Sequence, residues 1–220
     1  MCGLRRRAGI AREEQKGAIL NTIVSETMEQ SAEMPVDVFQ KLSNSRILFI
    51  SDEIDDELTS DICATLLLKD QECHEEKITL FINSYGGDIR NVLAIYDVMQ
   101  MIHSPIETVC MGAAHNEAAI LLVSGTEGMR FATKNSVICV GQLVNDWMRV
   151  HSDLVDAKSS LNQQLEDNKR MMDIFAVASG KDLKQVMSDF DRKVFMTSQE
   201  AMKYGLIDKV IKQTKKVAKK

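Results

Sequence analysis

Two adjacent glycines form the part of the sequence best suited to hold a reacting carbonyl or an anion. They lie in the segment Ile82-Asn-Ser-Tyr-Gly-Gly-Asp88. Glycine has no side chain, so the backbone N–H groups of Gly86 and Gly87 point outward, open to a ligand. Such a nest of N–H groups binds an oxyanion or a peptide carbonyl oxygen. The same pair also suits a plain tight turn, so this segment alone leaves both interpretations open.

Other side chains offer acid–base or nucleophilic chemistry. His115, Asn116 and Glu117 are consecutive, but on a helix neighbouring side chains point about 100° apart and do not face each other. Cys139 is a candidate nucleophile, although strand alternation there equally suits a packed core cysteine. Lys193 could activate a serine, as in Ser–Lys hydrolases, if a serine lay beside it.

Strand-like and helix-like segments alternate along the chain, which predicts an α/β fold. Short apolar runs predict strands at 46–50, 77–82, 106–111, 129–132, 137–140 and 206–211. Helices are predicted at 57–69, directly after 88, and at 113–124, 146–179, 181–189 and 197–204. Asp55 or Thr59 is expected to cap the first of these helices, and Gly205 to end the last.

The polarity of the sequence predicts one main domain with two flanking segments. The domain spans residues 34–211, with a long helical handle at about 142–178. Residues 1–33 are polar and are expected to form a mobile extension. The tail 212–220 holds five lysines and is expected to be solvated, with partner binding as the alternative.

Composition excludes several classes of function. A chain of 220 residues that is 45% hydrophobic can bury a substantial core, and its net charge of −5 gives no reason to expect a nucleic-acid partner. No apolar run approaches the roughly 20 residues that cross a membrane, so no membrane partner is expected. The histidines have no metal-ligand spacing, and no cofactor or metal is expected; they include His74, His103 and His151.

The five cysteines form no CxxC pair, which favours a reducing compartment. A cytoplasmic location is therefore expected. The arginines at 5–7 leave a transit peptide, and hence a plastid or plastid-like organelle, as the alternative.

Several motifs, in order and spacing, resemble the Clp protease proteolytic-subunit family (ClpP-like). Asn83-Ser-Tyr-Gly-Gly and Leu93-Ala-Ile-Tyr-Asp-Val-Met99 resemble its INSPGG pattern and AIYDTM-like helix. Cys110-Met-Gly-Ala-Ala114 resembles the stretch before its nucleophile elbow, and Arg130-Phe-Ala-Thr-Lys-Asn-Ser136 its KRxALPNS-like stretch. Three further segments of the chain resemble the family's closing motif: Asp189-Phe-Asp-Arg192, Phe195-Met-Thr-Ser-Gln-Glu-Ala201 and Tyr204-Gly-Leu-Ile-Asp208. The resemblance covers about Thr27 to Ile211.

Three positions depart from the family's Ser-His-Asp triad. The nucleophilic serine follows the motif's glycine, here Gly112, by four residues, and that position is Asn116, whose amide cannot be activated by a base. The position of the general-base histidine is Gly141, which has no side chain to carry a proton. The orienting aspartate follows Arg192, and that position is Lys193, a cation that would repel an imidazolium.

The resemblance therefore implies a non-catalytic subunit of the family's ClpR-like kind. It implies a Clp/crotonase-type fold of stacked ββα units with a long-helix handle. Heptameric rings would pair into a tetradecameric barrel, mixed with active ClpP-type subunits and served by a Clp-type AAA+ ATPase. The implied site residues are Gly86, Gly87 and Glu117 for oxyanion or peptide binding, and Asp191 and Arg192 for the contact between rings.

Trp147, Met148, Met171 and Met172 would lie in the core or at an interface, with the resemblance favouring an interface. Two rival functions remain: a serine-type ClpP endopeptidase subunit with a displaced triad, and a crotonase-type acyl-CoA enzyme. The closing segment between Asp191 and Asp208 argues against the second, because it resembles the Clp type specifically.

Overall fold

A computed structural model describes residues 38–143 and 154–212 of the chain. Apart from Val38, the described residues belong to one compact unit, residues 39–220. The predicted extension 1–33 and tail residues 213–220 lie outside the described residues. So do Trp147, Met148 and His151.

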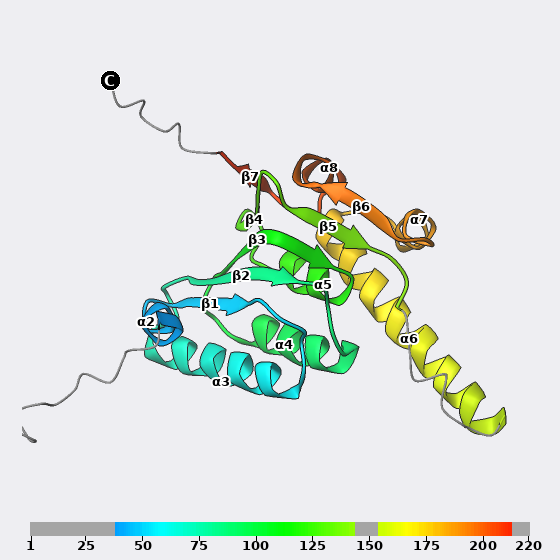
Figure 1. Ribbon diagram of the computed structural model, residues 1–220, viewed down its shortest axis with the longest axis horizontal. Coiled ribbons are helices and arrows are strands. Elements are labelled where there is room, and N and C mark those ends of the chain that lie inside the picture. The colour runs from blue at the N-terminus through cyan, green and yellow to red at the C-terminus, as the bar shows by residue number, and fades with distance from the viewer. Residues whose placement is uncertain (1–37, 144–153, 213–220) are drawn as a thin grey trace, which may run out of the picture. The chain divides into compact units, whose positions relative to one another are not determined.

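A mostly parallel sheet organises the described residues, and the predicted α/β class is confirmed (Figure 1). Its strands are β1 (Ile47–Ile50), β2 (Ile78–Ser84), β3 (Ile106–His115), β4 (Arg130–Thr133), β5 (Val137–Val140), β6 (Val194–Thr197) and β7 (Lys209–Ile211). The path β1-β2-β3-β4-β7 is parallel throughout. The last residues of β3 leave β4 and pair instead with β5, which carries β6 as an antiparallel neighbour. The sheet therefore forks at the end of β3.

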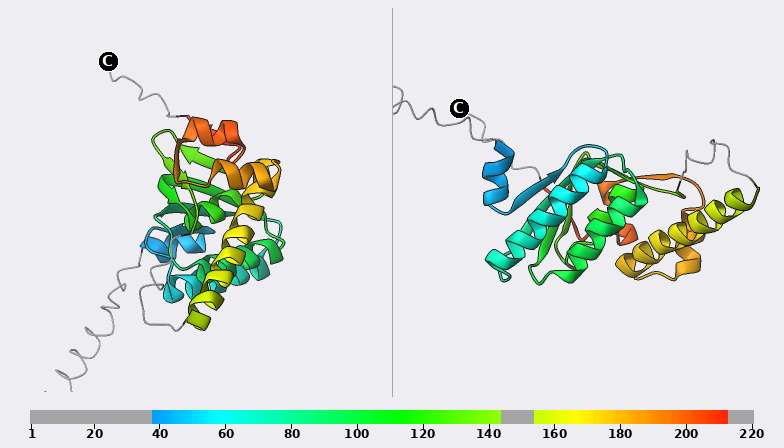
Figure 2. Two further views of the ribbon diagram at one scale, coloured as in Figure 1. Left: turned by 90° about the vertical axis from the view of Figure 1, so that its right-hand side faces the viewer. Right: turned by 90° about the horizontal axis from the view of Figure 1, so that it is seen from below.

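The described helices are α2 (Val38–Asn44), α3 (Asp56–Glu72), α4 (Ile89–Met101), α5 (Glu117–Val123), α6 (Leu154–Ser179), α7 (Leu183–Asp189) and α8 (Ser198–Tyr204). Helices α3, α4 and α5 cover one face of the sheet (Figure 1). Helices α3 and α4 lie side by side beneath the strands (Figure 2). All seven residues of α5 are buried between the sheet, α4 and α6. The short helix that follows β3 is therefore the centre of the core. Among the described residues, no helix is long and apolar enough to cross a membrane.

The predicted helix at 113–124 begins too early. Ala113, Ala114 and His115 continue β3 and pair with β5, and the helix starts at Glu117. Alanine favours helices by less than about 1 kcal/mol per residue, and the hydrogen bonds and packing of strand pairing outweigh that preference here. Two further elements, α2 and β6, were not predicted from the sequence.

The caps were predicted better than the ends of the helices. Asp55 is the N-cap of α3, and its carboxylate accepts the N–H of Leu58 at 2.9 Å. Gly205 follows α8 with φ 103°, the left-handed conformation that glycine adopts without strain.

The interface expected for Met171 and Met172 is wrong, because both pack in the core of this chain with exposures of 0% and 1%.

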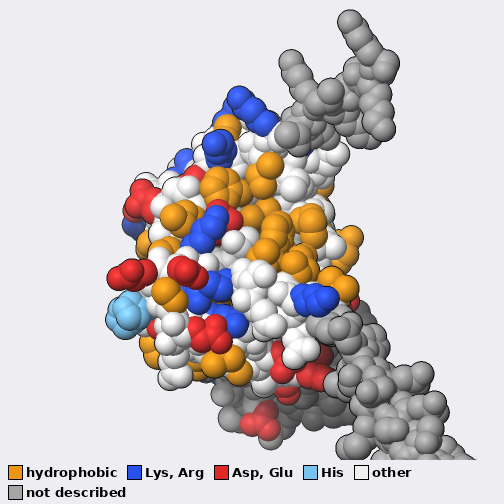
Figure 3. Space-filling model, turned by 90° about the vertical axis from the view of Figure 1, so that its left-hand side faces the viewer, with side chains coloured by type: hydrophobic (Ala, Val, Ile, Leu, Met, Phe, Trp, Pro, Cys, Tyr) orange, Lys and Arg blue, Asp and Glu red, His pale blue; other side chains and the backbone are white. Residues whose placement is uncertain are grey.

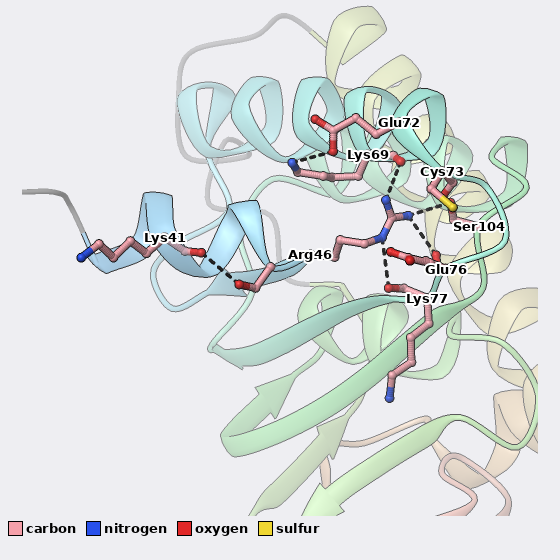
Figure 4. Close-up of polar contacts among 9 residues, drawn as sticks. Lys41, Arg46, Lys69, Glu72, Cys73, Glu76, Lys77 and Ser104 are labelled. Atoms are coloured by element: carbon pink, nitrogen blue, oxygen red, sulfur yellow. Dashed lines mark hydrogen bonds and ion pairs between the residues drawn. The ribbon is translucent and has the colours of Figure 1, made fainter.

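Arg46 ties the start of β1 to the ends of α3 and α4 (Figure 4). Its guanidinium donates to the carbonyl oxygens of Lys69 at 2.7 Å, Glu76 at 2.9 Å and Lys77 at 3.2 Å, and to the Ser104 hydroxyl at 3.0 Å. The residue is 8% exposed and has φ 61°. One side chain thus satisfies several carbonyl oxygens around the last turn of α3.

Replacing Arg46 by alanine is expected to lower the free energy of unfolding by about 3 kcal/mol, because it removes hydrogen bonds to four buried or partly buried acceptors. Arg46→Gly loses the same hydrogen bonds but adopts φ 61° freely, so it should be about 1 kcal/mol more stable than Arg46→Ala. Urea unfolding of the two variants measures both quantities. A cost below about 1 kcal/mol for both would contradict the stabilising role of the guanidinium.

Arg130 and Asp208 join β4 to the segment before β7. Arg130 Nη2 and Nε lie 2.6 and 3.0 Å from the Asp208 carboxylate, which also accepts the Arg130 backbone N–H at 2.9 Å. Partial burial pushes the pKa of Asp208 upward, but the Arg130 hydrogen bonds and charge outweigh it and hold the pKa below its usual range. The folded protein therefore favours the charged carboxylate.

The stabilisation from this pair is expected to depend on pH. Because the folded pKa lies below the unfolded one, it is fully present above about pH 4 and is lost as the pH falls through the folded pKa. Asp208→Asn should cost about 2 kcal/mol at pH 7, and the difference from the parent should shrink at pH 3. Urea unfolding at both pH values measures it, with the exposed Glu127→Gln as the control. A pH-independent difference would contradict the assignment.

Candidate functional site

The turn between β3 and α5 has the geometry that presents a nucleophile in many hydrolases. Asn116 stands at its tip with φ 45° and ψ −105°. Within the described residues, it and Arg46 are the non-glycine residues with positive φ. The Asn116 N–H donates to the carbonyl oxygen of Cys139 in β5 at 2.7 Å, which fixes the turn against the sheet. A strained residue between a strand and a helix is the mark of a nucleophile elbow.

The side chain on this elbow is an amide whose oxygen has no hydrogen-bond partner among the described residues. Asn116 Oδ1 is buried and accepts no hydrogen bond from any residue that the structure describes. Such a group costs about 1–3 kcal/mol, so its burial is unusual in a folded protein. Backbone strain and an unsatisfied polar atom thus coincide at one residue, where structures store strain for function more often than for stability.

The glycine turn predicted to hold a ligand is anchored on the loop after β1. Gly86 O accepts the N–H of Ile54 at 3.1 Å, and the N–H of Asp88 donates to Ile54 O at 3.2 Å. A Cβ on Gly87 would collide with the backbone of Ile54, and Gly86 has φ 110°. Gly87 is therefore required by a close approach of two backbones, and Gly86 by its left-handed backbone conformation.

The expectation that both N–H groups lie open is wrong. The Gly86 N–H donates to the hydroxyl of Ser84 at 3.1 Å. The carboxylate of Glu117 lies against this turn, with Oε2 at the position that a Cβ on Gly86 would take, and the backbone N–H groups of Gly87 and Glu117 act on it to lower its pKa. The structure thus brings Gly86, Gly87 and Glu117 together. Sequence reasoning missed that the Glu117 side chain turns toward the glycine turn.

Glu117 is an almost fully buried acid, with 9% of its surface exposed. Burial raises its pKa, while the two backbone hydrogen bonds and the charge of Lys193 act in the opposite direction. The nearby carboxylate of Asp88 adds to the rise. The net effect is a pKa above the usual range of a glutamate.

Gly141 and Lys193 are in contact next to this turn. A Cβ on Gly141 would lie 2.8 Å from Lys193 Cγ and 2.9 Å from Lys193 Cα, so the lysine covers the point where a side chain would project. Burial, and then the charge of Lys193, lowers the pKa of His115. The charge of Lys193 also acts on Glu117 and Cys139. The positions Asn116, Gly141 and Lys193 therefore gather at one end of β3 and β5.

Cys139 is not an activated nucleophile. It is 1% exposed, and burial raises its pKa even though Lys193 partly offsets that rise. The thiol therefore stays protonated at neutral pH, as expected of a core cysteine. Of the two interpretations of Cys139 left open by the sequence, the structure supports core packing.

An aromatic cluster beside the elbow was not anticipated. The imidazole of His115 lies between the rings of Tyr85 and Phe195, at centroid distances of 4.8 and 5.6 Å and near-perpendicular angles. Tyr85 and Phe195 are 77% and 62% exposed. The three residues come from distant segments, and Phe195 reaches the elbow only because β6 pairs with β5. Without a predicted β6, no sequence signal placed it there.

Asp191 and Arg192 lie on the loop before β6. The Arg192 side chain is 94% exposed, with its Nε 3.8 Å from the Asp191 carboxylate. Asp191 in turn accepts a hydrogen bond from Gln142 Nε2 at 2.8 Å. Arg192 is thus free to extend toward another molecule.

No cluster of three or more histidine, cysteine, aspartate or glutamate residues suited to a metal occurs in residues 38–143 and 154–212.

Comparison with known proteins identifies the group to which this arrangement belongs. The family model described as Clp protease matches residues 30–214. The chain belongs to the Clp protease family. A curated relative in Ligilactobacillus salivarius (strain UCC118) is named ATP-dependent Clp protease proteolytic subunit. It is 35% identical over 197 residues, which cover 89% of this chain and 98% of the relative.

Membership of the Clp protease family agrees with the fold. The crotonase-like fold of Clp proteases accounts for the mostly parallel sheet and its covering helices. The family consists of serine peptidases, and a strained turn between a strand and a helix is the type of element that carries a hydrolase nucleophile. In this Clp protease chain the strained turn between β3 and α5 has an asparagine at its tip.

Proposed function

We propose that this chain is a non-catalytic, ClpR-type subunit of an ATP-dependent Clp protease barrel. One observation carries the proposal: the tip of the strained elbow is Asn116, whose buried Oδ1 accepts no hydrogen bond from the described residues. The nitrogen lone pair of a side-chain amide is delocalised into its carbonyl group, and a neighbouring base does not convert it into an alkoxide-like nucleophile. The elbow thus retains its backbone geometry without its chemistry.

The residues around Asn116 support the same conclusion. Gly141 offers no group to accept a proton, and the stem of Lys193 lies against it. Burial and Lys193 both lower the pKa of His115, and the ring packs between Tyr85 and Phe195. A serine-type mechanism needs a base oriented toward the nucleophile and a carboxylate behind that base. Neither role has a candidate among these side chains.

The open face of the sheet supports a role in assembly. Phe49, Phe81, Val109 and Phe131 form one row in register across β1 to β4. Their neighbours Ile50 and Ile82 belong to the core beneath the sheet, so strand alternation turns this row to the opposite face. Phe49 and Phe81 stack at 5.2 Å and remain partly exposed, and Phe39 beside them is 59% exposed. Figure 3, which views the side where α2 lies, shows hydrophobic side chains gathered into a patch. Patches of this kind mark protein interfaces.

The proposed partners follow from the family. The relative's name, ATP-dependent Clp protease proteolytic subunit, describes a protein that works with ATP hydrolysis. We infer that this chain assembles with active ClpP-type subunits in a mixed barrel of heptameric rings, and that a Clp-type AAA+ ATPase docks on that barrel. In this arrangement the active subunits cleave peptides, and this chain contributes architecture.

Two measurements on the protein isolated with its partners test the proposal. A fluorophosphonate probe, which labels activated serines, is expected to label the partner subunit and leave this chain unmodified. Native mass spectrometry of the same sample is expected to show both chains in one barrel. Labelling of this chain would support the displaced-triad peptidase instead.

The displaced-triad alternative has little support among the described serines. Ser84 donates its hydroxyl to Asp52 O at 2.6 Å, and Ser136 donates to Cys110 O at 2.9 Å. Both hydroxyl protons are therefore engaged with backbone.

The second alternative, an acyl-CoA enzyme, needs backbone N–H groups that bind an oxyanion but no serine. Retention of the isolated chain on a coenzyme A column would favour it.

A further inference from the structure

We propose that the side chain of Glu117 acts as an internal ligand of the backbone cradle, by which we mean the N–H groups of Gly87 and Glu117. Its carboxylate occupies the place where a peptide carbonyl or an oxyanion would bind. This inference deepens the proposed function and rests on it for the meaning of the cradle. It assigns the side chain of Glu117 a role that the loss of triad residues does not explain. The Glu117 carboxylate therefore keeps other ligands out of the cradle.

The position of the carboxylate carries the argument. Glu117 Oε2 lies so close to Gly86 that a Cβ there would collide with it. The backbone N–H groups of Gly87, in the turn after β2, and of Glu117, the first residue of α5, act on the same carboxylate and lower its pKa. These N–H groups come from two segments far apart in sequence and converge on one side chain. The side chain therefore lies over the glycine turn.

The energetics show that this placement is specific. A glutamate at the first position of a helix usually extends into water, yet Glu117 is 9% exposed. Burying a carboxylate is costly unless hydrogen bonds and charges compensate. Here the two N–H groups and the charge of Lys193 compensate in part, while burial and the charge of Asp88 outweigh them and leave the pKa of Glu117 raised. The same donors that could stabilise an oxyanion thus stabilise the resident carboxylate.

Neighbouring contacts hold the glycine turn and the elbow together around Glu117. The rings of Tyr85 and His115, which precede Gly86 and Asn116 respectively, stack edge to face at 4.8 Å. A Cβ on Gly86 would also lie 3.4 Å from His115 O. Side chains and backbone therefore fix the distance between Gly87 and Glu117 that the carboxylate spans.

Amide hydrogen exchange at single-residue resolution tests the proposal directly. Removing the carboxylate with Glu117→Ala is expected to speed exchange of the Gly87 amide about tenfold or more, because the amide loses a charged acceptor. Glu117→Gln, which keeps one uncharged acceptor oxygen and nearly the same shape, should give an intermediate rate. If the Gly87 amide exchanges within about twofold of the parent rate in both variants, the proposal is overturned.

A matched control comes from α8. Glu200 accepts the Thr197 N–H at 2.8 Å, so Glu200→Ala should speed exchange at Thr197 and leave Gly87 unchanged. This control shows that the method detects the loss of one carboxylate acceptor.

Acetate then tests whether the vacated cradle binds a carboxylate. Sodium acetate is expected to slow the Gly87 amide again in Glu117→Ala and to have no effect on Glu117→Gln, whose side chain still fills the space. If acetate leaves Gly87 exchange in Glu117→Ala unchanged, the cradle is not a carboxylate site and the proposal fails. None of these readouts depends on catalysis or on partner subunits, so their failure is distinct from failure of the proposed function.

Discussion

A variant that combines Asn116→Ser, Gly141→His and Lys193→Asp is expected to show no peptide hydrolysis while Glu117 is present, and to gain it when Glu117→Ala is added. The groups of a triad act as a unit, so each single replacement should stay inactive. A donor that binds the oxyanion contributes about 10²–10³-fold in rate, and Glu117 takes up the Gly87 donor. The four-residue variant is thus expected to be about 100-fold or more faster than the three-residue variant.

Gly141 and Lys193 lie in contact, so their replacements act on each other. A Cβ at Gly141 would lie 2.9 Å from Lys193 Cα and 3.2 Å from Lys193 N, so the backbone at position 193 has to shift in every variant that carries Gly141→His. Lys193→Asp does not remove that contact, but it replaces a cation that would repel an imidazolium with a carboxylate that stabilises one. Gly141→His alone therefore introduces a base without its partner.

A fluorogenic peptide measures turnover, and a fluorophosphonate probe reports whether the serine introduced by Asn116→Ser is activated. Two results would contradict the reasoning. Turnover by Asn116→Ser alone would mean that a base already faces the elbow. Equal rates for the variants with and without Glu117→Ala would mean that the Glu117 carboxylate does not obstruct the cradle.

The parts of the fold that follow local rules could be predicted from the sequence. Most strands and the cap at Asp55 were identified because apolar runs and capping side chains act within a few residues. The elbow was placed inside a predicted helix, because Ala113 and Ala114 favour helix locally but pair with β5. Long-range pairing leaves no local signal, and the antiparallel strand β6 was missed for the same reason.

The candidate site shows the same division. The structure gathers Asn116, Gly141 and Lys193, the three positions that the resemblance singled out, at one end of the sheet. The resemblance did not indicate what fills the space around them. The inward turn of the Glu117 carboxylate depends on Gly87, 30 positions earlier in the sequence, and the His115 ring depends on Phe195 in β6. Contacts of this kind are set by the tertiary fold.

Replacing Arg192 by alanine is expected to separate a double ring into single rings while each subunit stays folded. The Arg192 side chain is 94% exposed, and its nearest carboxylate, Asp191, is 3.8 Å away and already accepts a hydrogen bond from Gln142. Within this chain Arg192 therefore contributes little to stability, since exposed ion pairs of this type are weak. The resemblance to the family gives it a role between rings.

Removing one partner of an Arg–carboxylate pair at a partly desolvated interface costs about 2–5 kcal/mol, and the loss is repeated around the ring. Analytical ultracentrifugation, with the active partner present if this chain does not assemble alone, should show about half the parent mass for Arg192→Ala with an unchanged circular dichroism spectrum. Lys184→Ala, which removes an exposed positive charge from α7, controls for net charge and should sediment as the parent. If Arg192→Ala also sediments as the parent, the exposed arginine does not join rings, and the apolar row across β1 to β4 is left as the main structural support for assembly.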